Sequence, residues 1–162
     1  MNGEEVRAFL TTLPPHTGKL ATVRADGRPH LAPVWYDVDG DGTLVFNTGA
    51  STVKGRNLRR DPRASLCVDD ERPPFSFVVV EGVVELSDDL ADVRAWATRI
   101  GGRYMGPGRA EEYAARNGVP GELVVRLRPQ HVVSARDLRT DPAPFVEPVL
   151  GRAALFVRGG LT

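Results

Sequence analysis

Apolar and polar residues alternate along most of this chain in short runs, which is the pattern of β-strands separated by tight turns. Asp26-Gly27 is a strong signal for a two-residue hairpin. The pair Glu81-Gly82 interrupts a long apolar run and predicts a bulge. The predicted strands cover residues 18–24, 29–38, 43–48, 63–69, 75–86 and 121–128. About six antiparallel strands with few helices predict a mainly β protein, a β-barrel with peripheral helices.

Helical spacing of apolar residues appears in only a few segments. Residues 3–13 form one such segment, and a second follows Asp88-Asp89 and continues to Ile100. The pair Gly101-Gly102 is predicted to end this second helix, and a short polar helix is predicted at 110–116.

A change of character near residue 139 divides the chain. Residues 1–138 are predicted to form one domain, which this length can supply with a fair-sized core. Residues 139–162 are predicted to form a Pro-rich C-terminal tail. Within this tail, residues 150–157 are apolar enough to pack on another surface, which the sequence does not identify.

The segment from Ser51 to Val68 predicts a short basic helix that ends at Asp61-Pro62 and is followed by a strand. Ser51 or Thr52 is suited to cap this helix. A helix N-terminus with a hydroxyl group and a lysine is a potential phosphate site. Only two of the 21 basic residues are lysines, which favours a specific role for Lys54. The alternative is an ordinary solvated basic surface.

Composition excludes several classes of function. The formal net charge is zero, which argues against a protein-wide field for nucleic acid. The single cysteine, Cys67, excludes an internal disulfide and is interpreted as a buried strand residue. The three histidines lack metal-ligand spacing, so no metal site is predicted. No signal peptide or membrane span is recognised, and we expect a soluble, cytoplasmic protein.

Familiar catalytic motifs are also missing. Ser51-x-x-Lys54 matches the S-x-x-K of penicillin-recognising enzymes, but the accompanying S-D-N and K-T-G elements are absent. There is no P-loop and no dinucleotide fingerprint. No acid–base pair stands out, so no catalytic residue is predicted. This absence fits a protein whose bound cofactor carries the chemistry.

Four segments together resemble a known family. They are GKLATVRADGRPHLAPVWY, LVFNTGASTVKGRNLRRDPRASLCV, FVVVEGVVEL and GELVVRL. The pattern resembles the flavin and deazaflavin oxidoreductases with a split β-barrel, the pyridoxamine-5'-phosphate oxidase-like proteins. It is more similar to the actinobacterial branch that uses the deazaflavin coenzyme F420. The resemblance covers residues 13–138, and an arginine-rich composition is compatible with an actinobacterial source.

The resemblance implies a homodimer with two equivalent cofactor sites at the subunit interface, each holding coenzyme F420 or, alternatively, FMN. It implies nine cofactor-binding positions. The ring would lie along Pro33, Val34 and Trp35, and the phosphate arm would meet Thr48 and Gly49. Ser51 and Lys54 would bind the phosphate, and Arg56 and Asn57 match the sequence that follows the lysine in the family. Relatives often carry a second basic residue just before the lysine. Here Thr52 and Val53 stand there, so another subunit could supply the missing charge.

For some aromatic and polar residues at or near these positions, more than one role is possible. Trp35 could contact the ring or pack in the core or the dimer interface. His30 could protonate product or cap the hairpin, and the second is favoured. Tyr104 and Met105 are candidates for a substrate pocket.

The function implied is hydride transfer between reduced F420 and a conjugated small-molecule acceptor. One alternative is an FMN-dependent oxidase or reductase of the pyridoxamine-5'-phosphate oxidase type. Another is a non-catalytic module that binds a cofactor or nucleic acid through the basic helix. The basic helix lacks the interleaved aromatics that stack single-stranded bases, so neither a nucleic-acid partner nor a membrane partner is expected.

Overall fold

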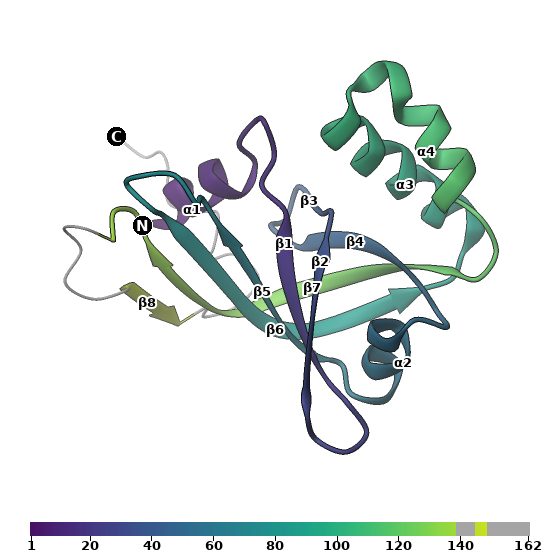
Figure 1. Ribbon diagram of the computed structural model, residues 1–162, viewed down its shortest axis with the longest axis horizontal. Coiled ribbons are helices and arrows are strands. Elements are labelled where there is room, and N and C mark those ends of the chain that lie inside the picture. Colours follow the sequence, from purple (N-terminus) through teal and green to yellow (C-terminus); the bar gives the residue numbers. More distant parts are fainter. Residues whose placement is uncertain (139–144, 149–162) are drawn as a thin grey trace.

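A single curled sheet of eight antiparallel strands organises the molecule (Figure 1). The computed structural model describes residues 1–138 and 145–148. The strands are β1 (Gly18–Val23), β2 (Pro29–Val34), β3 (Asp37–Val38), β4 (Leu44–Gly49), β5 (Arg63–Asp69), β6 (Phe77–Ser87), β7 (Glu122–Ala135) and β8 (Phe145–Pro148). Their order in the sheet is β2-β1-β5-β6-β7-β4-β3, and β8 pairs with β7.

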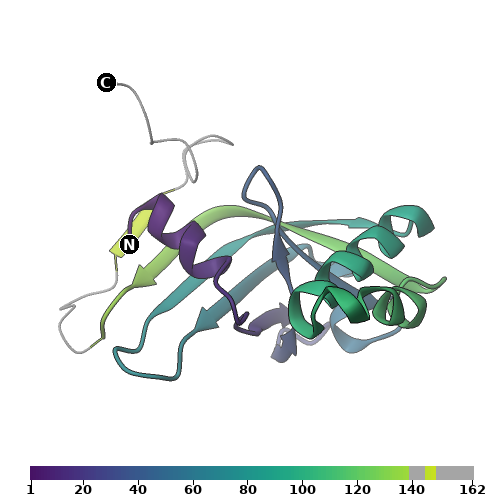
Figure 2. The same ribbon diagram turned by 90° about the horizontal axis from the view of Figure 1, so that it is seen from above.

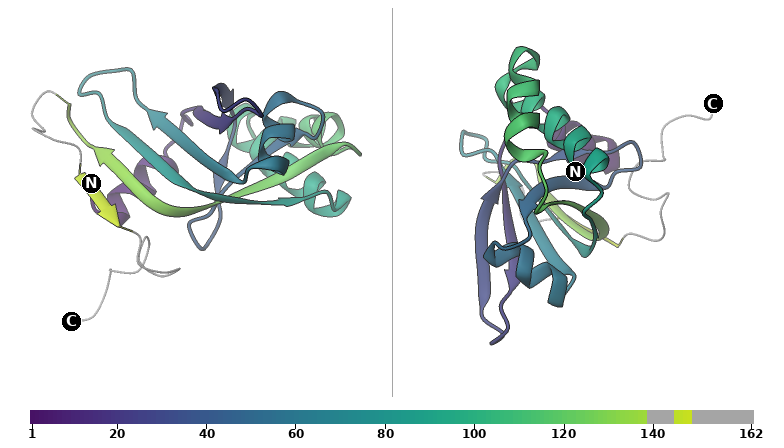
Figure 3. Two further views of the ribbon diagram at one scale, coloured as in Figure 1. Left: turned by 90° about the horizontal axis from the view of Figure 1, so that it is seen from below. Right: turned by 90° about the vertical axis from the view of Figure 1, so that its right-hand side faces the viewer.

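The two edges of this sheet are consecutive in the chain. Edge strand β2 pairs with β1, edge strand β3 pairs with β4, and only Trp35-Tyr36 connects them. The sheet therefore curls until its edges meet at this connection, as the views in Figure 3 show. This architecture confirms the predicted mainly β, split-barrel fold.

The strand count exceeds the prediction for two reasons. The predicted strand at 29–38 is divided at Trp35-Tyr36, where the chain passes from one edge of the sheet to the other. Strand β8 lies in the segment predicted as a tail and pairs with the end of β7. The other residues of that tail, including the apolar segment 150–157, lie outside the described residues.

The predicted bulge is confirmed in the long pairing of β6 with β7, where the register shifts between Glu81 and Gly82. A Cβ atom on Gly82 would lie 1.9 Å from the carbonyl oxygen of Arg128. Only glycine permits this close approach between the two strands.

Four α-helices accompany the sheet: α1 (Gly3–Leu10), α2 (Val53–Arg60), α3 (Leu90–Met105) and α4 (Ala110–Asn117). A 3₁₀ turn at Pro107–Arg109 precedes α4. The prediction that Gly101-Gly102 ends a helix is wrong, because α3 continues through both glycines to Met105. A Cβ atom on Gly101 would lie 2.4 Å from Tyr113 Cβ, so this glycine lets α4 pack closely on α3.

Apolar side chains form two clusters on the opposite faces of the sheet. The main core, inside the curl, contains Phe46 from β4 and is joined by Val6 and Leu10 of α1. The second cluster joins Val45 and Val124, on the outer face of β4 and β7, to α3. The paired helices α3 and α4 therefore lie beside the outer face of these two strands, as Figure 2 shows from above. Within the described ranges, no helix has the length and apolar character needed to cross a membrane.

Candidate functional site

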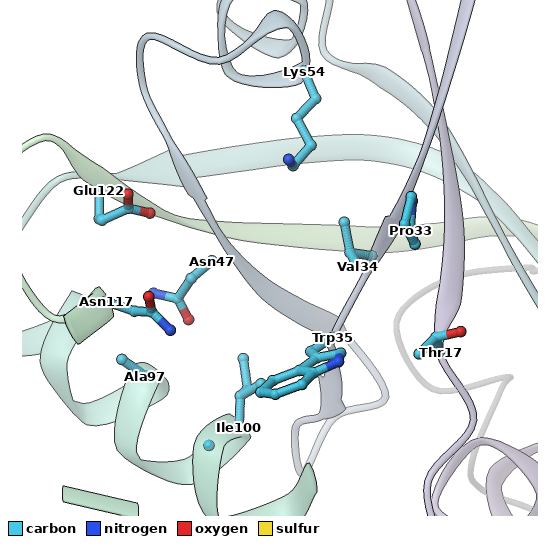
Figure 4. A pocket seen from close by; sticks show the side chains of 11 residues that line it. Thr17, Pro33, Val34, Trp35, Asn47, Lys54, Ala97, Ile100, Asn117 and Glu122 are labelled. Atoms are coloured by element: carbon cyan, nitrogen blue, oxygen red, sulfur yellow. The ribbon is translucent and has the colours of Figure 1, made fainter. Parts of the chain in front are cut away.

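A cavity of about 340 Å³ lies where the end of β2, the start of α2, the outer face of β4 and β7, and helix α3 meet (Figure 4). Four of the nine predicted site residues line it: Pro33, Val34, Trp35 and Lys54. The other lining residues are Thr17, Asn47, Ala97, Ile100, Gly101, Asn117 and Glu122. The structure thus brings together two groups of predicted residues that are separated in sequence: Pro33, Val34 and Trp35 at the end of β2, and Lys54 at the start of α2.

Lys54 enters the cavity from the first turn of α2 (Figure 4). The cap of this helix is Thr52, whose Oγ1 accepts a hydrogen bond from the Gly55 N–H at 3.1 Å. Of the two predicted caps, the structure thus selects Thr52 rather than Ser51. The Lys54 ammonium group forms no hydrogen bond or ion pair with any residue that the structure describes. An ammonium group without a partner at the N-terminal turn of a helix is suited to bind an anion.

Close packing holds α2 against the end of β4. A Cβ atom on Gly55 would lie 2.3 Å from the backbone oxygen of Gly49. We therefore expect Gly55→Ala to move the helix and to lower the free energy of unfolding by about 1–3 kcal/mol. Urea titration measures this change. Gly40→Ala is the matched control, because a Cβ atom there meets open space. Equal stabilities of the two variants would contradict the packing argument.

The aromatic floor of the cavity is Trp35, and a tyrosine holds it in place. The Trp35 ring stacks on Tyr104, with ring centroids 4.8 Å apart and an interplanar angle of 3°. The Tyr104 hydroxyl donates to the His16 carbonyl at 2.7 Å and accepts from the Tyr36 N–H at 3.3 Å. Tyr104 thus supports Trp35 but does not itself line the cavity. Burial raises the pKa of the Tyr104 hydroxyl. Trp35 packs against the outer cluster and also lines the cavity, and its contact with a cofactor ring stays a prediction.

Four polar lining residues, Thr17, Asn47, Asn117 and Glu122, were not predicted. Asn47 Nδ2 donates to the Val93 carbonyl at 3.3 Å, while its Oδ1 is buried without a donor among the described residues. Glu122 begins β7 and is paired in register with Gly49. Its Oε1 lies 3.2 Å from the place where a Cβ atom of residue 49 would stand. Only the register of β4 with β7 brings this carboxylate to the cavity, and no local sequence signal indicates it.

The environment of Glu122 opposes its ionisation. Burial raises the pKa of the Glu122 carboxyl above its ordinary value, and the positive charge of Lys54 partly offsets the shift. The folded protein therefore holds a proton on this group more firmly than the unfolded chain does. This carboxyl makes its best contribution to stability below its ordinary pKa, and the contribution falls as pH rises through the raised pKa.

We therefore expect Glu122→Gln to change the pH dependence of stability. The variant should gain stability relative to the natural protein between about pH 4 and about pH 7, because glutamine carries no charge to desolvate. Urea midpoints of both proteins at the two pH values measure this difference. A difference that does not change with pH would contradict the burial of this carboxyl.

The remaining predicted site residues secure the corner around α2. The Thr48 side chain is buried, with Oγ1 3.1 Å from Thr52 Oγ1. Asn57 is also buried and donates to Thr22 Oγ1 at 3.0 Å. The exposed Arg56 guanidinium donates to the backbone carbonyl of Ser51. None of these side chains, nor Gly49, lines the cavity, and their contact with a cofactor stays a prediction.

His30 also lies outside the cavity lining. Its Nδ1 is 3.5 Å from Thr22 Oγ1. Desolvation and then the charges of Arg24 and Lys54 lower the pKa of its imidazole. Both interpretations of His30 stay predictions. The described residues contain no group of three side chains arranged to hold a metal ion.

Comparison with known proteins identifies the family. Residues 3–135 match the pyridoxamine 5'-phosphate oxidase family, and the chain belongs to it. The chain is 38% identical over 128 residues to a pyridoxine/pyridoxamine 5'-phosphate oxidase of Cupriavidus taiwanensis, covering 76% of this chain and 57% of that enzyme. It therefore spans little more than half of that relative. This is a family of the flavin-type oxidoreductase class.

Other similar proteins include reductases. The chain is 29% identical over 124 residues to a 5a,11a-dehydrotetracycline/5a,11a-dehydrooxytetracycline reductase of Streptomyces rimosus, and the match covers 72% of each chain. A solved structure described as an F420 reductase has a TM-score of 0.58 and 28% identity, covering 73% of this chain and 89% of the other. A conserved hypothetical protein of Mycobacterium tuberculosis has a TM-score of 0.74 and 29% identity, covering 93% of both chains.

Proposed function

We propose that this protein is an oxidoreductase that uses coenzyme F420 and transfers hydride between the reduced deazaflavin and a conjugated small molecule such as an enone or quinone. The observation that carries this proposal is the position of Lys54. Its ammonium group has no partner in the described part of the chain and shares a cavity with the aromatic floor. An anion site beside a flat aromatic surface fits a phosphorylated, ring-bearing cofactor.

The residues present fit such a group. Lys54 and the free N–H groups of the first turn of α2 would hold the phosphate. Pro33, Val34 and Trp35 would lie along the flat ring, and Ile100 of α3 lines the cavity beside Trp35. The volume of about 340 Å³ is at the small end of the range for sites that enclose a ligand. A cofactor would therefore extend beyond the walls that one chain supplies.

The cofactor, when bound, supplies the hydride from its central ring. This chain then has to orient the ring and the acceptor and to exclude water from the space between them. Trp35 is suited to the first task, because its stacked partner Tyr104 is fixed by two hydrogen bonds. The apolar side chains of Ala97 and Ile100 are suited to the second.

A second copy of the chain would complete the site, so we include a homodimer in the proposal. Leu31, on the edge strand β2 that also carries Pro33, is 67% exposed. The outward side of β1, β5 and β6 adds half-buried apolar or weakly polar side chains, among them Ala21, Cys67 and Val79. Sedimentation analysis should give twice the chain mass of 17.6 kDa. A monomer that binds cofactor would contradict this part of the proposal.

Turnover tests the reaction directly. Reduced F420 is mixed with a panel of enones and quinones, and its reoxidation is followed with and without the protein, free of oxygen. We expect acceleration with at least one acceptor, which Lys54→Ala should largely remove. Tight binding of F420 without turnover of any acceptor would instead indicate a cofactor carrier.

The second candidate is an FMN-dependent oxidase or reductase of the same family. The 38% identity to the Cupriavidus enzyme favours it. Its test is loading with FMN, followed by oxygen consumption with pyridoxamine 5'-phosphate and with pyridoxine 5'-phosphate.

A further inference from the structure

We infer that Glu122 determines ligand specificity by accepting hydrogen bonds from uncharged hydroxyl groups of the ligand, next to the phosphate position. This inference rests on the proposed function, because it assigns the ligand class that the same cavity selects. It predicts preference for a ring that carries a polyol chain over the same ring without one.

Glu122 lies at the end of the cavity where β4, β7 and α2 meet. Its Oε1 lies beside Gly49, the register partner of Glu122, and both Glu122 and Lys54 line the cavity (Figure 4). A Cβ atom on Gly49 would lie 3.1 Å from Thr52 Cγ2 and 3.2 Å from Glu122 Oε1. The absence of a side chain at residue 49 thus leaves room for this carboxylate beside the helix cap.

The Glu122 carboxylate has no side-chain donor within the part of the chain that the structure describes. Among the residues that the structure describes, Glu122 accepts no side-chain hydrogen bond and forms no ion pair, even with Lys54 in the same cavity. A ligand that fills the cavity and displaces solvent from this half-buried carboxylate has to bring donors of its own, because the described part of the protein supplies none.

Asn47 gives the same wall a second acceptor. Its amide nitrogen donates to the carbonyl of Val93, which can only accept, so the orientation of the amide is set and Oδ1 is the atom left without a donor. Asn47 and Gly49 are two residues apart on β4, and their register partners on β7 are Val124 and Glu122. Both acceptors therefore belong to one face of the sheet.

The opposite charges of Lys54 and Glu122 in one cavity limit which chemical groups of a ligand can bind beside Glu122. A second anionic group beside Glu122 would be repelled, and an apolar group would leave its carboxylate unsatisfied. An ammonium group would satisfy it, but it would also lie near Lys54 and be repelled by that charge. Hydroxyl groups donate without adding charge, and a polyol chain that joins a phosphate to a ring carries several of them.

The competing role is electrostatic. If Glu122 served only to balance the charge of Lys54, its removal would leave Lys54 more attractive to phosphate. Binding of every phosphorylated ligand would then become tighter. The two roles therefore predict opposite changes for the same variant.

A series of related ligands distinguishes these roles. Lumiflavin is the ring alone, riboflavin adds the polyol, and FMN adds the phosphate. F420 and its ribityl deazaflavin core, which lacks the phosphate, form the parallel pair. Dissociation constants are measured for the natural protein, Glu122→Ala, Glu122→Gln and Lys54→Ala. Glu111→Ala is the control, because Glu111 lies on the exposed side of α4.

For Glu122→Ala we expect the affinity for riboflavin and FMN, or for the deazaflavin pair, to fall about tenfold or more. Lumiflavin affinity should not change, and Glu122→Gln should lose less because its amide oxygen still accepts. Lys54→Ala should weaken only the phosphorylated ligands. Tighter FMN or F420 binding by Glu122→Ala, or an equal loss for lumiflavin, overturns the inference. Absence of binding of every ligand by the natural protein overturns the proposed function as well.

Discussion

Lys54→Ala is expected to weaken binding of the phosphorylated cofactor by about 1.5–3 kcal/mol, or roughly 10- to 150-fold. The reason is that the Lys54 ammonium has no other partner among the described residues and lies at the first turn of α2. A charge-assisted hydrogen bond from this group to phosphate would be lost without any replacement. Fluorescence titration with F420 and with FMN measures the change.

Arg59→Ala is the matched control for this prediction. Arg59 lies on the same helix but is exposed and does not line the cavity. Its removal takes the same charge from α2, so it reports the general electrostatic contribution of the basic helix. Equal losses for both variants would indicate a diffuse basic surface instead of a phosphate site at Lys54.

Arg103→Met is expected to lower the free energy of unfolding by about 3–5 kcal/mol, the largest stability change that we predict. The Arg103 side chain is only 9% exposed and lies 3.7 Å from Asp37. Its guanidinium donates to three carbonyls at the end of α1: Leu10 at 2.9 Å, Thr11 at 3.3 Å and Thr12 at 3.3 Å. Methionine fills the space but removes the donor to the Thr11 and Thr12 carbonyls, while the Leu10 carbonyl keeps the Tyr36 hydroxyl and Asp37 keeps Arg99.

The measurement is urea unfolding of the natural protein and the variant. Arg116→Met is the control, because Arg116 is exposed in the last turn of α4 and its loss should have little effect. A small loss for Arg103→Met would mean that Arg99, which also pairs with Asp37 at 2.6 Å, is sufficient to hold this region.

The sequence could predict those features that depend on local pattern. Alternating apolar residues located the strands, and Glu81-Gly82 located the bulge where β6 and β7 approach closely. The short basic helix begins and ends as its capping residues predict, with Thr52 at its start and Asp61 at its end. The predicted grouping of Trp35 with Lys54 came from the resemblance, since nothing local links a residue of β2 to one of α2.

The features that the sequence could not predict depend on long-range packing. Gly101 was interpreted as a helix breaker, whereas its small size serves the contact of α3 with Tyr113. Glu122 resembles an ordinary polar residue at the start of a strand until its register with Gly49 is known. Arg103 could not be distinguished from the other arginines, because its partners lie about 90 residues away at the end of α1.

The family assignment and the cavity together limit the chemistry without naming the substrate. A single fold can support several reactions, so the argument for function has to come from the site. At this site Lys54 can hold an anion, Trp35 can lie against a flat ring, and strands β4 and β7 contribute the acceptor oxygens of Asn47 and Glu122. A phosphorylated cofactor with a polyol chain and a planar ring system would satisfy all three.

The most direct measurement is a side-by-side binding titration of the purified protein with coenzyme F420 and with FMN, after its own visible spectrum has been recorded. Our account predicts saturable, tight binding of F420 and weak binding of FMN, with Lys54→Ala weakening the first. A yellow protein, or tight binding of FMN alone, would move the protein to the flavin-dependent branch of its family. Binding of neither cofactor by the folded protein would contradict the account.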